Sequence, residues 1–187
     1  FAITEQTTSD WTVCATIMQD EFDNLYVLDV FRFKSDDGNA IVEHMIDQYL
    51  LWDADYLGME DGQIWKSLRS QFEKRCKERK VYPSTQILVP LTDKLVRANP
   101  LKGRMQLGKV LFPEADSRPW VDVCVREMIV FPNGKHDDQV DALAWAVRMT
   151  LERPPPKDPT PKPKGPESWK KKLQRMLSGQ GGGHMAA

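Results

Sequence analysis

Three aspartates gather at the start of one predicted helix. Residues 134–147 read GKHDDQVDALAWAV, in which a loop glycine precedes Asp137, Asp138 and Asp141. Side chains three and four residues apart share a helix face, so Asp141 lies on the face of the other two. Carboxylates held this closely need a cation to relieve their repulsion, and all-oxygen ligation favours Mg²⁺ or Mn²⁺ over zinc. The spacing therefore predicts part of a divalent-metal site.

Helix capping is the alternative explanation for the first two aspartates. An aspartate at a helix start accepts a backbone amide hydrogen bond and complements the helix dipole. Asp141 is one turn further along, beside alanines that face the core, and capping does not explain it. The residue types alone leave both interpretations open. His136, just before the aspartates, is either a general acid or an ordinary loop residue.

A further carboxylate, Glu60, follows a short apolar segment. The sequence LGMEDGQIW predicts a strand over 55–59 that ends at Glu60, and then a helix over 63–79. In open α/β sheets, ligands gather at the carboxyl ends of the strands. Glu60 is therefore expected to complete the metal site or, together with Asp61, to cap the helix that follows.

The remaining elements must position these carboxylates. In the last predicted helix, Val140, Leu143, Ala144 and Val147 form an apolar stripe that seats it on a sheet. The order of the expected elements, which is strand, strand, helix, strand, helix, strand and then helices, predicts an α/β domain: a mixed sheet with an antiparallel hairpin, flanked by helices. The expected strands are 11–18, 25–33, 55–59, 86–91 and 109–112, and the expected helices are 40–52, 63–79, 93–107 with a break near Asn99–Pro100, 120–128 and 137–151.

Composition divides the chain into two parts. Residues 1–152 are expected to form one domain, and residues 153–187 a Pro-rich linker with a basic, flexible tail in which 167–178 has the pattern of a short amphipathic helix. The first part carries 18 Lys/Arg and 25 Asp/Glu, whereas the tail carries eight and two. An acidic body is unusual for a generic DNA binder, which needs positive charge, but it agrees with a carboxylate metal site.

Several classes of protein are disfavoured by the same sequence. No apolar run reaches the length of a membrane span, and no phosphate-binding loop of the G-x-x-x-x-G-K-[ST] type occurs, so no nucleotide site is expected in this chain. Three cysteines at long spacings form no metal-ligand pattern, which favours a reducing, intracellular setting.

The order of these motifs resembles the nuclease domain of the large terminase subunits of tailed phages and herpesviruses. The resemblance covers residues 1–150 and implies a RuvC-like, RNase H-like fold. It also implies that the domain is a metal-dependent DNA endonuclease, which cuts concatemeric genomic DNA during packaging by two-metal-ion hydrolysis. The segments that carry it are AITEQTTSDWTV (2–13), the strand ending at Glu60, TDKLVRANPL (92–101), MQLGKVLFP (105–113) and HDDQVDAL (136–143).

The resemblance also implies roles for particular residues. Two Mg²⁺ or Mn²⁺ ions would be held by Glu60 and by the helix aspartates Asp137, Asp138 and Asp141, and the spacing leaves open which of these three bind directly. The first aspartate of the family pattern is expected just before Phe1, and Asp10 is expected near the metals as an auxiliary carboxylate or, alternatively, as a turn residue. His136 would be a candidate general acid.

Partners follow from the same resemblance. Double-stranded DNA would be contacted without sequence readout, and the portal or prohead and the small terminase subunit would be partners of the whole motor in the host cytoplasm. A solvated helix face is the alternative role for the basic residues of the third helix. The expected DNA contacts are Lys94, Arg97, Lys102, Arg104 and Lys135.

Two other functions agree with the same residues. One is another RNase H-like nuclease, of the resolvase or transposase type. The other is a non-catalytic DNA- or portal-binding module in which the carboxylates are structural.

Overall fold

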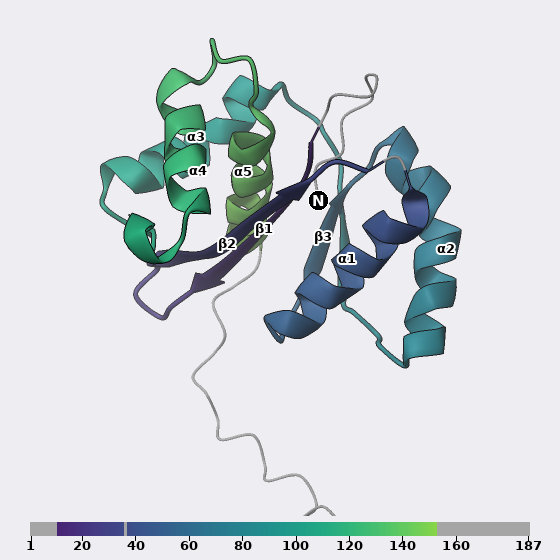
Figure 1. The fold of residues 1–187 in the computed structure, drawn as a ribbon. Helices are drawn as coiled ribbons and strands as arrows, with labels where there is room; N and C mark the ends of the chain where they lie inside the picture. The colour runs from purple at the N-terminus through teal and green to yellow at the C-terminus, as the bar shows by residue number, and fades with distance from the viewer. Residues whose placement is uncertain (1–10, 36, 153–187) are drawn as a thin grey trace, which may run out of the picture. The chain divides into compact units, whose positions relative to one another are not determined.

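The computed structural model describes residues 11–35 and 37–152, which form a mixed α/β domain (Figure 1). The strands are β1 (Thr12–Gln19), β2 (Leu25–Phe33), β3 (Leu57–Glu60), β4 (Thr85–Leu88) and β5 (Val110–Leu111). The helices are α1 (Gly38–Leu51), α2 (Gln63–Arg79), α3 (Lys94–Gln106), α4 (Trp120–Val130) and α5 (Asp138–Leu151), with a 3-10 turn, η1 (Ala115–Ser117). The order of elements is the expected one, with ends shifted by a few residues.

A mixed sheet is built around the early hairpin. β1 and β2 pair antiparallel, from Thr12 opposite Phe33 to Gln19 opposite Leu25, with an irregularity between Thr16 and Ile17. β5 adds to β2 in parallel. Among the described residues, β3 and β4 form a separate parallel pair. The expected hairpin and mixed sheet are therefore confirmed, and β3 is placed beside β4 rather than in the first sheet.

One face of the first sheet packs on α5. Side chains alternate between the two faces of a strand, and β1 and β2 turn Val13 and Leu25 into a core that also contains Leu143 and Val147 of α5. The apolar stripe expected in the last helix is confirmed, since its four residues are all buried. This packing fixes the helix that carries the aspartates.

A second core lies beneath β3. The helices α1 and α2 pack on it through Met45, Ile46 and Phe72, which surround Leu57 and Met59 of the strand. Leu57 and Met59 are buried whereas Gly58 and Glu60 are half-buried, so Glu60 leaves the strand on the face opposite this core. The second core therefore anchors the strand that presents Glu60.

The expected break near Asn99–Pro100 is wrong, because α3 runs without interruption through Pro100. Its start is capped by Asp93, whose side chain accepts from the Val96 amide at 2.8 Å. Beyond the cap, Ala98 packs on α5 and Leu101 enters the first core on either side of the proline. Tertiary packing therefore maintains a helix that the local sequence disfavours.

Replacing Pro100 with alanine is expected to raise the free energy of unfolding by about 1–3 kcal/mol, because alanine restores one helix hydrogen bond. The gain is reduced by the larger entropy of the unfolded chain. Urea denaturation measures the change. Asn99→Ala, at the exposed neighbouring position, is the control and is expected to change stability by only about 0.5 kcal/mol. A Pro100→Ala protein that is less stable than the parent would show that the proline fits a local bend.

The structure bears on the expectation about membrane spans but not on the expectation about the tail. None of the helices in residues 11–35 and 37–152 has the length and apolar character of a membrane span. The expected linker and tail, residues 153–187, lie outside the described residues, as does Asp10.

Candidate active site

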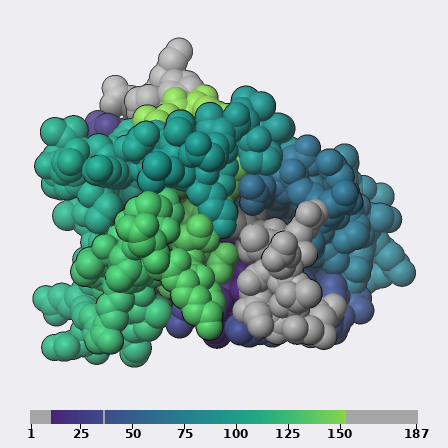
Figure 2. Space-filling view, turned by 90° about the horizontal axis from the view of Figure 1, so that it is seen from above, coloured from purple at the N-terminus to yellow at the C-terminus, as the bar shows by residue number. Residues whose placement is uncertain are grey.

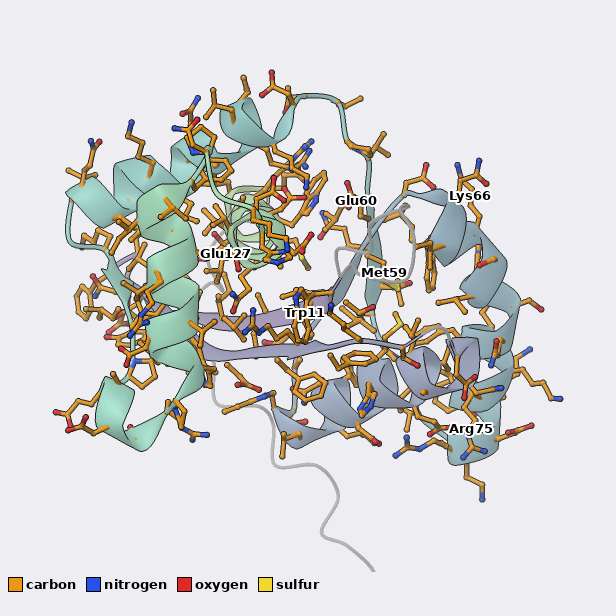
Figure 3. The ribbon with its side chains drawn as sticks, turned by 45° about the horizontal axis from the view of Figure 1, so that its top comes forward. Trp11, Met59, Glu60, Lys66, Arg75 and Glu127 are labelled. Carbon is orange, nitrogen blue, oxygen red and sulfur yellow. The ribbon has the colours of Figure 1, made fainter. Side chains whose placement is uncertain are left out.

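Glu60 is the last residue of β3 and lies between α5 and α2 (Figure 3). The alternative role as a helix cap does not fit, because α2 begins after Gly62 with no side-chain hydrogen bond at its cap. Asp61 pairs instead with Lys66 at 3.4 Å. Burial raises the pKa of Glu60, and the negative charge of Asp141 raises it further. The two carboxylates, from β3 and α5, are therefore close enough to interact.

The start of α5 is capped by a residue from another helix. Asp137 occupies the cap position, but its side chain makes no capping hydrogen bond. The carboxylate of Glu127 in α4 accepts from the backbone amide of Gln139 at 2.6 Å and from that of Val140 at 3.4 Å, and the Gln139 side chain also donates to it. Because Glu127 supplies the cap, the side chain of Asp137 is available for another partner.

Replacing Glu127 with alanine is expected to lower the free energy of unfolding by about 1–3 kcal/mol, because the buried amide of Gln139 loses its acceptor. Glu127→Gln keeps a carbonyl oxygen at the same place and is expected to cost clearly less. Urea denaturation of the two variants measures the difference. Equal losses for alanine and glutamine would mean that the carboxylate charge, rather than the hydrogen bond, stabilises the helix start.

Arg97 of α3 holds Asp141 in the interior. Its Nε and Nη2 atoms each lie 2.7 Å from Oδ1 of Asp141, and both side chains are only 4% exposed. The guanidinium also donates to the carbonyl of Thr92 at 3.0 Å and lies 4.5 Å from the ring centroid of Trp145. Arg97 was expected to contact DNA, and the structure places it instead inside the protein as the partner of an aspartate.

Lys94, one turn before Arg97, lies among the carboxylates. Its Nζ donates to Oδ1 of Asp137 at 2.7 Å. Burial lowers the pKa of Lys94, but the hydrogen bond to Asp137 and the attraction of Asp137, Asp141 and Asp138 outweigh it, so the pKa is above its usual value. The same ammonium also counteracts the raised pKa of Glu60. One cation therefore interacts with all four carboxylates that the sequence singled out.

The other expected DNA contacts differ in their surroundings. Arg104, near the end of α3, pairs with Asp23 in the β1–β2 turn at 2.8 Å and donates to its carbonyl. Lys102 and Lys135 are exposed, and His136 is half-buried in the loop before α5. The structure therefore brings together Glu60, Lys94, Arg97 and the three aspartates, and does not bring Arg104 to them.

Glu127 is the residue that sequence reasoning missed. It lies three residues after Cys124 and six after Val121, and all three are buried on one face of α4. A carboxylate at helical spacing within an apolar stripe requires a buried partner. That spacing was the available signal.

The donor set fits a divalent cation by its chemistry. Glu60, Asp138 and Asp141 offer only oxygen ligands in a partly buried setting, and the Lys94 ammonium already stands in for positive charge among them. In residues 11–35 and 37–152, no three His, Cys, Asp or Glu side chains are arranged as a ready ligand set. A cation there would therefore need the carboxylates to turn from Lys94 and Arg97, or a ligand from outside these residues.

The fold and the positions of the acidic residues together identify the class of protein domain. A mixed sheet flanked by helices, with a carboxylate ending one strand and aspartates opening the last helix, is an RNase H-like, nuclease-type domain. A comparison with protein-family models matches residues 1–150 to the terminase RNaseH-like domain. The chain therefore belongs to that terminase family, and its partners in general terms are DNA and a packaging motor. None of the curated proteins matches the sequence.

Proposed function

We propose that this domain is a metal-dependent DNA endonuclease that cuts concatemeric genomic DNA during viral packaging. The observation that carries the proposal is the placement of Glu60, at the end of β3, where burial and the charge of Asp141 in α5 both raise its pKa. Family membership supports the reaction class. A helix cap, the ordinary explanation for such aspartates, is supplied by Glu127 instead.

The roles of the residues follow from their contacts. Two divalent ions, Mg²⁺ or Mn²⁺, about 3.5–4 Å apart would activate a water and stabilise the leaving oxygen of the phosphodiester. Glu60, Asp138 and Asp141 would hold them, with Asp137 near by and a further carboxylate from the segment around Asp10 or before Phe1. Arg97 contacts Oδ1 of Asp141 through both Nε and Nη2, and the proposal assigns the other carboxylate oxygen, Oδ2, to a cation.

Lys94 and Arg97 have different roles in this proposal. Lys94 is partly exposed and forms an ion pair with Asp137, so we expect it to move to a phosphate oxygen when a cation takes its place. Arg97 is buried and held by Thr92, Asp141 and the Trp145 ring, so it stays and orients the carboxylate. His136 lies in the loop before α5 and remains the candidate general acid.

Plasmid cleavage with Mn²⁺ tests the proposal. The chain is compared with a form extended upstream to include the expected first aspartate, and EDTA is the control. The extended form is expected to convert supercoiled plasmid to linear products in Mn²⁺ and to do nothing in EDTA. Absence of cleavage together with absence of Mn²⁺ binding would reject the endonuclease and leave a non-catalytic DNA- or portal-binding module. Cutting during packaging, with the portal and the small subunit, belongs to the same proposal for the whole motor.

A further inference from the structure

Two cations stack on one indole ring at the start of β1. The Cζ atom of Arg32 lies 4.5 Å from the ring centroid of Trp11, and the Nζ atom of Lys34 lies 4.8 Å from it. Arg32 is opposite Val13 in the hairpin, so it projects from the face of the sheet that packs on α5. We call Trp11, Arg32 and Lys34 the Trp11 cluster.

The cations of the Trp11 cluster have no ion-pair partner within the part of the chain that the structure describes. Among residues 11–35 and 37–152, no carboxylate lies within ion-pair distance of Arg32 or Lys34. The domain is acidic overall, and most of its arginines do have such a partner: Arg69, Arg75, Arg79, Arg97, Arg104 and Arg148. A half-buried arginine stacked on tryptophan and left unpaired is therefore free to bind an anion.

The Trp11 cluster lies at the active-site end of the domain. β2 runs toward the end at which β3 finishes (Figure 1). Trp11 packs against the core that α5 shares with β1 and β2. Figure 3 shows Trp11, Glu127 and Glu60 arranged around α5, which is seen nearly end-on. Figure 2 looks onto this end, with α3 in teal and α4 in green on one side and α2 in blue on the other.

The basic residues expected to hold DNA are largely occupied elsewhere. Lys94 and Arg97 neutralise the aspartates, and Arg104 is bound to the β1–β2 turn. An acidic domain that acts on a polyanion still needs cations beside its site, because phosphate contacts supply most of the affinity for DNA. Arg32 and Lys34 of the Trp11 cluster are two further cations, which their stacking on the indole ring holds in place.

We infer that the Trp11 cluster is a phosphate-binding site that holds the backbone of the DNA beside the carboxylates. The inference rests on the proposed nuclease function for its substrate. Arg32 lies in β2 and Lys34 follows the end of that strand, and both cationic groups lie over the ring of Trp11, so they are close enough together to contact one DNA backbone. Stacking on the indole restricts both side chains before DNA arrives, which lowers the entropic cost of binding. Contacts of this kind read no base sequence.

Fluorescence anisotropy with a labelled DNA duplex in EDTA tests this site without cleavage. The double variant Arg32→Gln/Lys34→Gln is compared with Lys74→Gln/Lys77→Gln, which removes the same charge from the exposed surface of α2. The first variant is expected to bind about tenfold more weakly. Its plot of log K against log salt is expected to be shallower by about 1.8, or 0.9 for each lost phosphate contact. The α2 variant is expected to stay within about twofold of the parent, with the same slope.

Two further variants separate this site from the nuclease proposal. Trp11→Phe keeps an aromatic ring but weakens the cation stacking, and an intermediate affinity is expected. Glu60→Gln is expected to bind the duplex at least as well as the parent although it does not cleave. If Arg32→Gln/Lys34→Gln and the α2 variant weaken DNA binding equally, or if Arg32→Gln/Lys34→Gln leaves the salt slope unchanged, the proposed phosphate-binding role of the Trp11 cluster is overturned. The nuclease proposal would remain intact. Cleavage by Glu60→Gln at the rate of the parent would overturn the proposed role of Glu60 in the metal site, while the anisotropy result still stands.

Discussion

Replacing Arg97 with methionine is expected to lower the free energy of unfolding by about 3–5 kcal/mol, because it leaves the other partner of a buried ion pair, Asp141, without a compensating charge. Methionine fills much of the same volume but removes both contacts to Oδ1 of Asp141 and the one to the Thr92 carbonyl. Cleavage is expected to fall as well, because the aspartate loses the group that orients it. Chemical denaturation and plasmid cleavage measure the two effects.

A double-mutant cycle shows whether the loss comes from the ion pair. Asp141→Leu alone leaves the guanidinium buried without its anion and is expected to cost about as much as Arg97→Met. Combining the two substitutions removes both charges. The double variant is expected to lose about 1–3 kcal/mol less stability than the sum of the two single losses. Additive losses would mean that Arg97 stabilises the domain through packing on Trp145 alone.

Replacing Glu60 with glutamine is expected to lower Mn²⁺-dependent cleavage about a thousandfold. A metal ligand contributes several kcal/mol to the transition state, and about 4 kcal/mol corresponds to three powers of ten in rate. Without added metal, the same variant is expected to melt a few degrees above the parent, because it removes a carboxylate that burial and Asp141 both disfavour. Single-turnover cleavage and thermal melting in EDTA measure the two changes.

The melting difference for Glu60→Gln has a definite pH dependence. The pKa of Glu60 is raised in the folded protein above its ordinary value of 4.5. The protonated side chain therefore costs nothing extra at pH 4, and the parent loses stability as the pH rises through the interval from 4.5 to the raised pKa. The gap between variant and parent is expected to open over that interval and then stay constant. A gap that is the same at pH 4 and pH 8 would place its origin in packing.

Adding Mn²⁺ is expected to reverse the order of stability. A ligand that binds only the folded state raises its melting temperature, and the parent has the carboxylate that the variant lacks. Asp61→Asn is the matched control, since it removes a neighbouring charge that pairs with Lys66. It is expected to cleave like the parent and to gain the same stability from Mn²⁺. Equal gains in the parent and Glu60→Gln would exclude Glu60 as a ligand.

The parts of the fold that could be predicted from the sequence are those in which a regular pattern of residues extends along a whole strand or helix. The hairpin has alternating β-branched and aromatic residues over two strands, and α5 has an uninterrupted apolar stripe, so both were expected where they occur. The grouping of Asp137, Asp138 and Asp141 follows from helix geometry alone. The position of Glu60 at the end of β3 also follows from the local pattern, because the strand ends where its apolar run ends.

The rest depends on contacts between distant segments. Arg97 and Asp141 are 44 residues apart, and a buried arginine on α3 has the same local pattern as one on a solvated helix face. Pro100 disfavours a helix locally, and only the packing of α3 on α5 maintains it. The cap from Glu127 could not be predicted because it depends on how α4 meets α5. The local sequence indicates that Glu127 needs a buried partner, but it does not identify the partner in any of these three cases.

The bond from Glu127 to the start of α5 makes α4 and the first turn of α5 a single cooperative unit. The amides of Gln139 and Val140 end on a side chain of α4, so they become accessible to solvent only when the two helices separate. Native-state hydrogen exchange at these amides should therefore report the opening of α4, with protection greater than the fraying end of an ordinary helix shows. The start of α5, which carries the aspartates, is thus stabilised by α4, a helix that contributes none of those aspartates.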